Sequence, residues 1–300
     1  MYGLLAVATL TALSFTLTKT CLLYAKPLFI VSFRLITAGS ILLILYNFFV
    51  RPRIRINRAH RHLFATIFFF GIYLAALLNI WSLQYLTSIK ATFINNLGPF
   101  FAIVLSYFLL GERMTKKKWL GLTIGLIGII PIFTVQPAPV NTSKAFFWSS
   151  FHIPEIVAMS SLLSYYYGWI AMRKLMQTKL YSPIYVSGIC MFAGGILMAY
   201  TSLFFEGWEA IFNREKFLLF SGLLVLVSDI SLFNTYAYLL KSYTVTFVSF
   251  GLLMAPAIGS IFGTLFLKEP FYYVYLIPLV TMPIGLYIFY KEEQRLQQDT

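Results

Sequence analysis

Charged residues are scarce in this chain: Asp, Glu, Lys and Arg make up 11% of its 300 residues, against about 25% in a typical soluble domain. Apolar residues account for 59%. They fall into repeated runs of roughly 20 residues, the length at which a helix crosses about 30 Å of hydrocarbon. A water-soluble fold has no place for this excess, so the composition predicts an all-α polytopic membrane protein.

Residues and motifs that mark enzymes are also few. The two cysteines, Cys21 and Cys190, lie in expected helices without metal or redox spacing, and we interpret them as packing residues. The three histidines, His60, His62 and His152, lie in or near expected loops without an acidic partner. The sequence contains no G-x-x-x-x-G-K-[ST], G-x-S-x-G or H-E-x-x-H motif. We therefore expect neither a primary pump nor an enzyme, and no cofactor or metal.

Ten apolar stretches are long enough to be membrane helices. We expect them at residues 3–25, 27–49, 63–85, 87–109, 117–135, 153–172, 182–204, 217–240, 244–266 and 271–290. An even number of spans places both ends of the chain on the same side of the membrane.

Basic residues indicate which side that is. If the N-terminus is cytoplasmic, the cytoplasmic segments hold 15 Lys and Arg residues and the opposite segments hold six. Positive segments stay in the cytoplasm, so we expect a multi-pass protein of the cell inner (cytoplasmic) membrane with both termini cytoplasmic. The net charge of +13 is then a topology signal, and the partner surface is the lipid bilayer rather than nucleic acid.

The two halves of the sequence are related. Pro99 precedes Glu112 by 13 residues, and Pro256 precedes Glu269 by the same distance. At the common offset of 157, further identities pair Thr87 with Thr244, Phe93 with Phe250 and Gly128 with Gly285. A repeat of five helices is odd in number, so the second copy must enter the membrane from the opposite face. Inverted repeats are typical of secondary transporters, whose substrate lies near the midplane between the halves.

Several motifs resemble one family. They are Arg34 early in the second helix, Leu83-Gln84-Tyr85-Leu86, the block from Pro99 to Gly111-Glu112-Arg113, and Trp119-Leu120-Gly121. This pattern resembles the EamA-type branch of the drug/metabolite transporter superfamily over nearly the whole chain. Two departures are Lys268-Glu269-Pro270 in place of the usual Gly-Glu-Arg, and Thr11-Ala12 where the family commonly has Trp-Gly.

The resemblance implies a ten-helix secondary carrier. Its parts would be a first five-helix repeat at 1–136, an outer connecting loop at 137–152, a second repeat at 153–290 and a cytoplasmic tail at 291–300.

Three ionisable residues fall inside expected helices: Lys19, Arg34 and Asp229. Such groups are costly in a bilayer unless they face a wet cavity or a partner. Lys19 and Arg34 are expected about 10 Å below the outer surface, and Asp229 near the midplane. One hypothesis is that the two bases hold a carboxylate while Asp229 meets an ammonium, a sulfonium or a coupling proton. The alternative is that Asp229 neutralises Lys19 or Arg34 in a helix-packing ion pair.

Polar and aromatic neighbours are further candidates for substrate contact: Trp81, Asn95, Asn96, Tyr165, Tyr166, Trp169 and Tyr236. Aromatic faces stack on flat rings or hold cations, although the same residues can simply pack against lipid or other helices. The asparagines can instead bond between helices. Pro99 and Pro256 are candidate hinges or static kinks, and we expect Glu112 and Glu269 to cap or anchor the repeats.

These features predict a secondary carrier that moves a small amino-acid-like or zwitterionic metabolite by alternating access. EamA-type carriers of intracellular bacteria include S-adenosylmethionine importers, so the resemblance implies this compound as one specific substrate. An exporter of aromatic amino acids is the alternative, and a membrane scaffold or receptor subunit is the alternative of another class. A proton and a counter-substrate are both candidate partners, and the sequence sets no oligomeric state.

Overall fold

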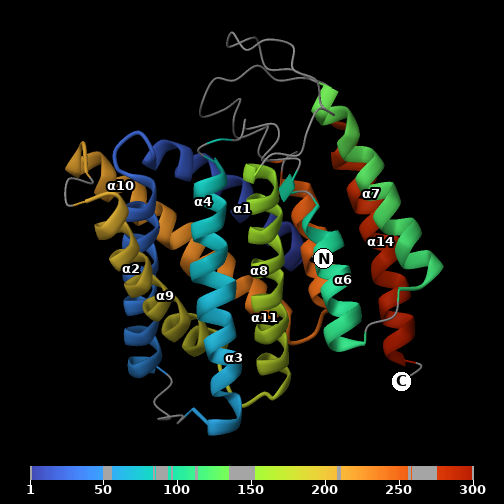
Figure 1. Ribbon diagram of the computed structural model, residues 1–300. Helices are drawn as coiled ribbons and strands as arrows, with labels where there is room; N and C mark the ends of the chain where they lie inside the picture. Colours follow the sequence, from blue (N-terminus) through green and yellow to red (C-terminus); the bar gives the residue numbers. More distant parts are fainter. Residues whose placement is uncertain are drawn as a thin grey trace.

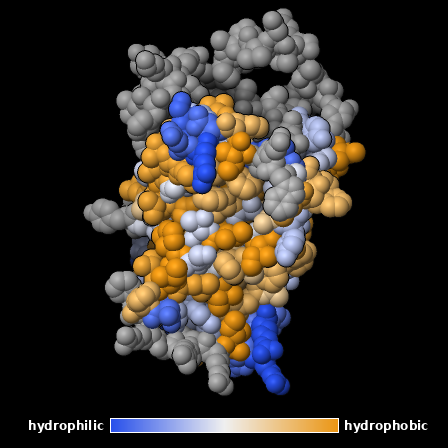
Figure 2. Space-filling view, turned by 90° about the vertical axis from the view of Figure 1, so that its left-hand side faces the viewer, coloured by the Kyte–Doolittle hydropathy of each residue, from blue (hydrophilic) through white to orange (hydrophobic). Residues whose placement is uncertain are grey.

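The structure is a computed structural model, and it describes residues 2–49, 56–83, 85, 94–95, 97–111, 114–134, 153–207, 211–255, 258 and 276–298. Within these ranges the regular elements are helices, apart from one isolated bridge between Ala25 and Ile211. Four described stretches are long and apolar enough to cross a membrane: Pro27–Phe48, Arg58–Ser82, Pro183–Phe205 and Arg214–Leu239. Figure 2 shows the matching surface, with hydrophobic residues over the middle of one face and hydrophilic residues towards its two ends.

The described helices follow the apolar runs of the sequence (Figure 1). In the first half they are α1 (Tyr2–Cys21), α2 (Pro27–Phe49), η1 (Arg58–His60), α3 (Arg61–Thr66), η2 (Ile67–Leu74), α4 (Ala75–Leu83), α6 (Gly98–Leu110) and α7 (Lys116–Thr134). In the second half they are α8 (Ile153–Gln177), α9 (Pro183–Phe205), α10 (Arg214–Leu224), η3 (Val225–Leu232), α11 (Phe233–Leu239), α12 (Val245–Gly251), η4 (Leu252–Met254) and α14 (Leu276–Gln298). The segments η2 and η3 are π-helical.

Several helix ends differ from the sequence-based expectation; α8, for example, runs to Gln177 rather than to residue 172. The first helix stops at Cys21 rather than near residue 25, because the chain turns there and Ala25 pairs with Ile211. The last helix continues to Gln298, through the expected tail. That extension is rich in Glu, Gln, Lys and Arg, which are good helix formers, and Lys117 of α7 reaches Glu292 at 3.5 Å.

Helices α2 and α9 form the most extensive contact between the two halves. Both have 23 residues and begin with proline, and their bounds are 156 residues apart (27 to 183 and 49 to 205). Proline suits the first helical turn because its missing N–H would be unpaired there. The helices approach at glycines: a Cβ on Gly39 would lie 2.5 Å from the backbone nitrogen of Phe192, and one on Gly195 would lie 2.8 Å from that of Ile36.

Other contacts also occur in matched pairs. The third helix, α3–η2–α4, packs on α8, and its counterpart in the second half, α10–η3–α11, packs on α1. Helix α6 packs on α12, and α7 packs along α14 at one edge of the molecule (Figure 1). The π-helical segments η2 and η3 both have eight residues and lie 158 positions apart (67 to 225). The two halves therefore share their irregular turns as well as their helices.

Candidate functional site

Arg34 of α2 and Asp229 of η3 meet in a bidentate ion pair. Arg34 Nε donates to Asp229 Oδ2 at 3.0 Å, and Nη2 donates to Oδ1 at 2.8 Å. Nη2 also donates to Ser228 Oγ at 3.3 Å. The Arg34 side chain is 16% exposed and that of Asp229 is 5% exposed. Two parallel bonds between charged groups are stronger and more directional than a single contact, so this pair ties α2 firmly to η3.

The positions that correspond to Arg34 and Asp229 in the opposite halves of the repeat carry no charge. The counterpart of Arg34, 156 residues later, is Cys190, whose thiol lies 3.7 Å from the Phe64 carbonyl. The counterpart of Asp229, 158 residues earlier, is Gly71 in η2, where a Cβ would lie 3.0 Å from the Gly168 Cα of α8. A charged contact in one half thus corresponds to close backbone packing in the other, and the site is asymmetric.

An aromatic cluster follows Asp229 along the same helix. Phe233 and Tyr236 come about one and two turns after Asp229. The Trp169 ring of α8 lies 4.5 Å from Phe233 and 4.1 Å from Tyr236, measured between ring centroids. Tyr165 adds a ring 5.8 Å from Trp169. The structure therefore places a buried ion pair between α2 and η3, and four aromatic rings on α8 and on the following turns, in α11.

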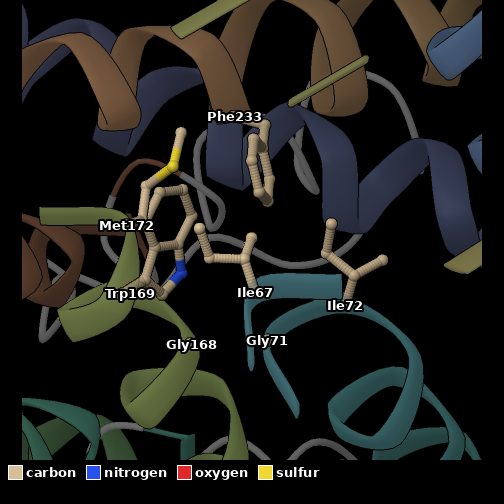
Figure 3. A pocket seen from close by; sticks show the side chains of 7 residues that line it. All are labelled: Ile67, Gly71, Ile72, Gly168, Trp169, Met172 and Phe233. Atoms are coloured by element: carbon tan, nitrogen blue, oxygen red, sulfur yellow. The ribbon is translucent and has the colours of Figure 1, made fainter. Parts of the chain in front are cut away.

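A small apolar cavity of about 10 Å³, roughly the space for one water molecule, adjoins this cluster (Figure 3). It lies between η2, α8 and α11, and its lining is Ile67, Gly71, Ile72, Gly168, Trp169, Met172 and Phe233. Ligand pockets are typically about 300–1,000 Å³. A metabolite of that class needs more room than this cavity offers, so these helices have to separate to admit one.

Tyr166 connects the cluster to α6, and its own helix, α8, also packs on α12. A Cβ on Gly98, the first residue of α6, would lie 2.5 Å from the Tyr166 hydroxyl oxygen. Glycine at this position lets the tyrosine ring lie against the start of α6. Pro99 follows as the second residue of α6 and is buried.

The remaining candidates from the sequence lie elsewhere or outside the described residues. Trp81 is 37% exposed, and its described ring contact is with Tyr85 at 4.9 Å. Asn95 is half-buried in the short stretch before α6. Lys19 lies in α1. The other candidates, Asn96, Glu112, Pro256 and Glu269, lie outside the residues that the structure describes. All of these stay predictions.

Sequence reasoning missed the hydrogen bonds that two residues flanking α9 form with the start of α2 and with the start of η1. At one end, the Glu206 carboxylate accepts the first amides of α2, from Leu28 and Phe29, each at 2.9 Å. These amides are unpaired within a helix, and their positive end attracts an acid. At the other end, the Tyr181 hydroxyl accepts the Asn57 amide at 3.1 Å and lies 3.1 Å from His60 Nδ1. The segments that meet are distant in sequence, so no local pattern could reveal them.

Comparison with known proteins identifies relatives of the whole chain. A transporter of Chlamydia muridarum named "S-adenosylmethionine/S-adenosylhomocysteine transporter" is 33% identical over 94% of this chain and 88% of its own length. A protein of the same name from Chlamydia trachomatis serovar L2 is 31% identical over 94% of this chain and 86% of its length. The "Uncharacterized transporter YoaV" of Bacillus subtilis is 24% identical over 90% and 89%.

A solved structure titled "Crystal structure of protein" matches with a TM-score of 0.75 over 95% of this chain and 93% of its own. At 15% identity this likeness shows the fold alone. The model of the EamA-like transporter family matches residues 1–134 and 152–291, which is most of the sequence. The chain therefore belongs to the EamA-like transporter family and is a multi-pass membrane transporter, not an enzyme.

Proposed function

We propose that this protein is a secondary carrier that moves S-adenosylmethionine across the cell inner membrane by alternating access. The observation that carries the proposal is the buried Arg34–Asp229 pair beside the aromatic cluster of Tyr165, Trp169 and Tyr236. The substrate offers a carboxylate, two cationic centres and a flat adenine ring, and each finds a complementary group here. The name shared by the two chlamydial relatives supports this substrate.

The complementarity follows from charge and shape. The substrate carboxylate suits the Arg34 guanidinium, which matches carboxylates bidentately, and Lys19 is the second candidate base. The ammonium and sulfonium groups suit Asp229. Adenine suits the ring faces of Trp169 and the neighbouring tyrosines. In the state described here Arg34 and Asp229 satisfy each other, so a zwitterion that replaces both partners leaves neither charge unpaired.

The transport cycle proposed here uses two inverted repeats of five helices, at 1–136 and 153–290, joined by an outer loop at 137–152. The matched lengths of α2 and α9, the matched π-helical segments and the paired contacts support this arrangement. The small size of the cavity fits an occluded state in such a cycle. Both termini, with the tail at 291–300, would then be cytoplasmic.

The test is uptake of labelled S-adenosylmethionine and of a panel of amino acids into proteoliposomes. Asp229→Asn and Lys19→Ala are the site variants, and Ser231→Ala is the matched control, because Ser231 is exposed on the same π-helical segment as Asp229. We expect the wild-type protein and the control variant to take up S-adenosylmethionine, and we expect both site variants to lose this uptake. Uptake of aromatic amino acids without uptake of S-adenosylmethionine would show that the protein is the alternative, a carrier of aromatic amino acids. A folded protein that moves none of these compounds would contradict the proposal.

A further inference from the structure

Tyr236 has a buried hydroxyl without a hydrogen-bond partner among the described residues. The residue is 2% exposed. Leaving a buried polar group unpaired destabilises the folded state, so each such group in a folded protein calls for an explanation. A ligand that supplies the missing partner is one physical explanation.

The neighbouring tyrosines differ from Tyr236 in this respect. Among the described residues, the hydroxyls of Tyr165 and Tyr166 are not among the buried oxygens that lack a partner, whereas that of Tyr236 is. The Tyr236 ring packs against the Trp169 ring at 4.1 Å. Of these three adjacent tyrosines, Tyr236 is therefore the one whose hydroxyl is left for an external partner.

Aromatic rings and helix backbone both line the cavity beside the cluster. Trp169 and Phe233 both line the cavity. The Trp169 ring contacts the Tyr236 ring, and Phe233 comes three residues before Tyr236 on the same helix. Gly71 and Gly168 contribute no side chain to the lining, so helix backbone forms that part of the wall (Figure 3). Separating η2 from α8 would widen this cavity, which the Trp169 and Phe233 rings already line.

We propose that Tyr236 is a specificity-determining residue whose hydroxyl hydrogen-bonds the nucleobase of the substrate while the base lies against Trp169. This inference rests on the proposed function. A purine ring presents both ring-nitrogen acceptors and an amino donor, and a phenolic hydroxyl is both a donor and an acceptor. The hydroxyl is thus assigned to the adenine end of the substrate, separate from the Arg34–Asp229 pair at the amino-acid end.

The experiment compares Tyr236→Phe with Tyr238→Phe. Both changes remove one oxygen, and Tyr238 is 64% exposed on the same helix, so it is the matched control. We expect Tyr236→Phe to raise KM about fivefold for both S-adenosylmethionine and S-adenosylhomocysteine, because the two share adenine and the loss of one hydrogen bond, about 1 kcal/mol, corresponds to about a fivefold change. The maximal rate should change little, and Tyr238→Phe should behave as wild type.

Thermal unfolding in detergent separates this role from a structural one. Removing an unpaired buried hydroxyl should leave the unfolding temperature of Tyr236→Phe equal to or above that of the wild type. Equal KM values in the two variants would overturn the role of Tyr236 and leave the proposed function standing. A wild-type protein that takes up neither adenosyl compound would overturn the proposed function itself.

Discussion

Removing both charges of the Arg34–Asp229 pair should destabilise the protein far less than removing one. The two side chains share hydrogen bonds of 2.8 and 3.0 Å and are largely buried. Arg34→Met or Asp229→Leu alone leaves an uncompensated buried charge, which costs about 3–5 kcal/mol of unfolding free energy. The double variant replaces the pair with apolar side chains, and such replacements are often neutral or stabilising. We expect the double variant to unfold within about 1 kcal/mol of the wild type.

Thermal unfolding of the four proteins in detergent micelles measures this coupling as a double-mutant cycle. Ser231→Leu is the control, because it places an apolar side chain at an exposed position of the same segment. If the two single losses simply add in the double variant, the pair is not the stabilising unit described here.

Uptake by the same proteins tests what the charges do in transport. We expect the double variant to fold and yet to transport nothing, because a zwitterionic substrate would meet neither the Arg34 guanidinium nor the Asp229 carboxylate. A double variant that regains both stability and uptake would show that Arg34 and Asp229 serve only helix packing.

Three further predictions concern the contacts around α2 and η1. Gly39→Ala should destabilise the protein by about 1–3 kcal/mol in thermal unfolding, because its Cβ would meet the backbone of α9. Gly222→Ala is the control and should leave the unfolding temperature unchanged, because a Cβ there would have no atom within 4 Å. Glu206→Ala should lower the free energy of unfolding by about 0.5–2 kcal/mol, because it leaves the first amides of α2 unpaired. Glu215→Ala, at an exposed position, is its control, and equal unfolding temperatures of the two variants would refute the capping role. Tyr181→Phe should cost about 1 kcal/mol by removing the acceptor of the Asn57 amide at the start of η1, and an unchanged unfolding temperature would show that this bond contributes nothing.

The sequence was sufficient for the family and for most of the helices. Apolar runs mark membrane helices because hydrocarbon selects side chains by polarity alone, residue by residue. The predicted helix at residues 27–49 coincides with α2, and the predicted helix at 182–204 lies within one residue of α9 at each end. The same rule made Arg34 and Asp229 visible, because ionisable residues are rare in such runs.

Tertiary structure decided how these residues meet. The sequence offered both Lys19 and Arg34 as partners for Asp229, and the fold joins Arg34 to it across 195 positions of the chain. No local periodicity encodes a contact at that separation. The π-helical turns in η2 and η3 likewise escaped prediction, because their extra residue depends on how the helix packs against its neighbours.

Composition and motifs therefore determined that this chain is a polytopic EamA-type transporter with a few costly charges in its spans. Only packing decided that Tyr236 is left with an unpaired hydroxyl beside Trp169, and that Gly71 and Gly168 line a small cavity. The physical reason is that hydropathy acts on each residue separately, whereas hydrogen bonds and cavities depend on which helices become neighbours.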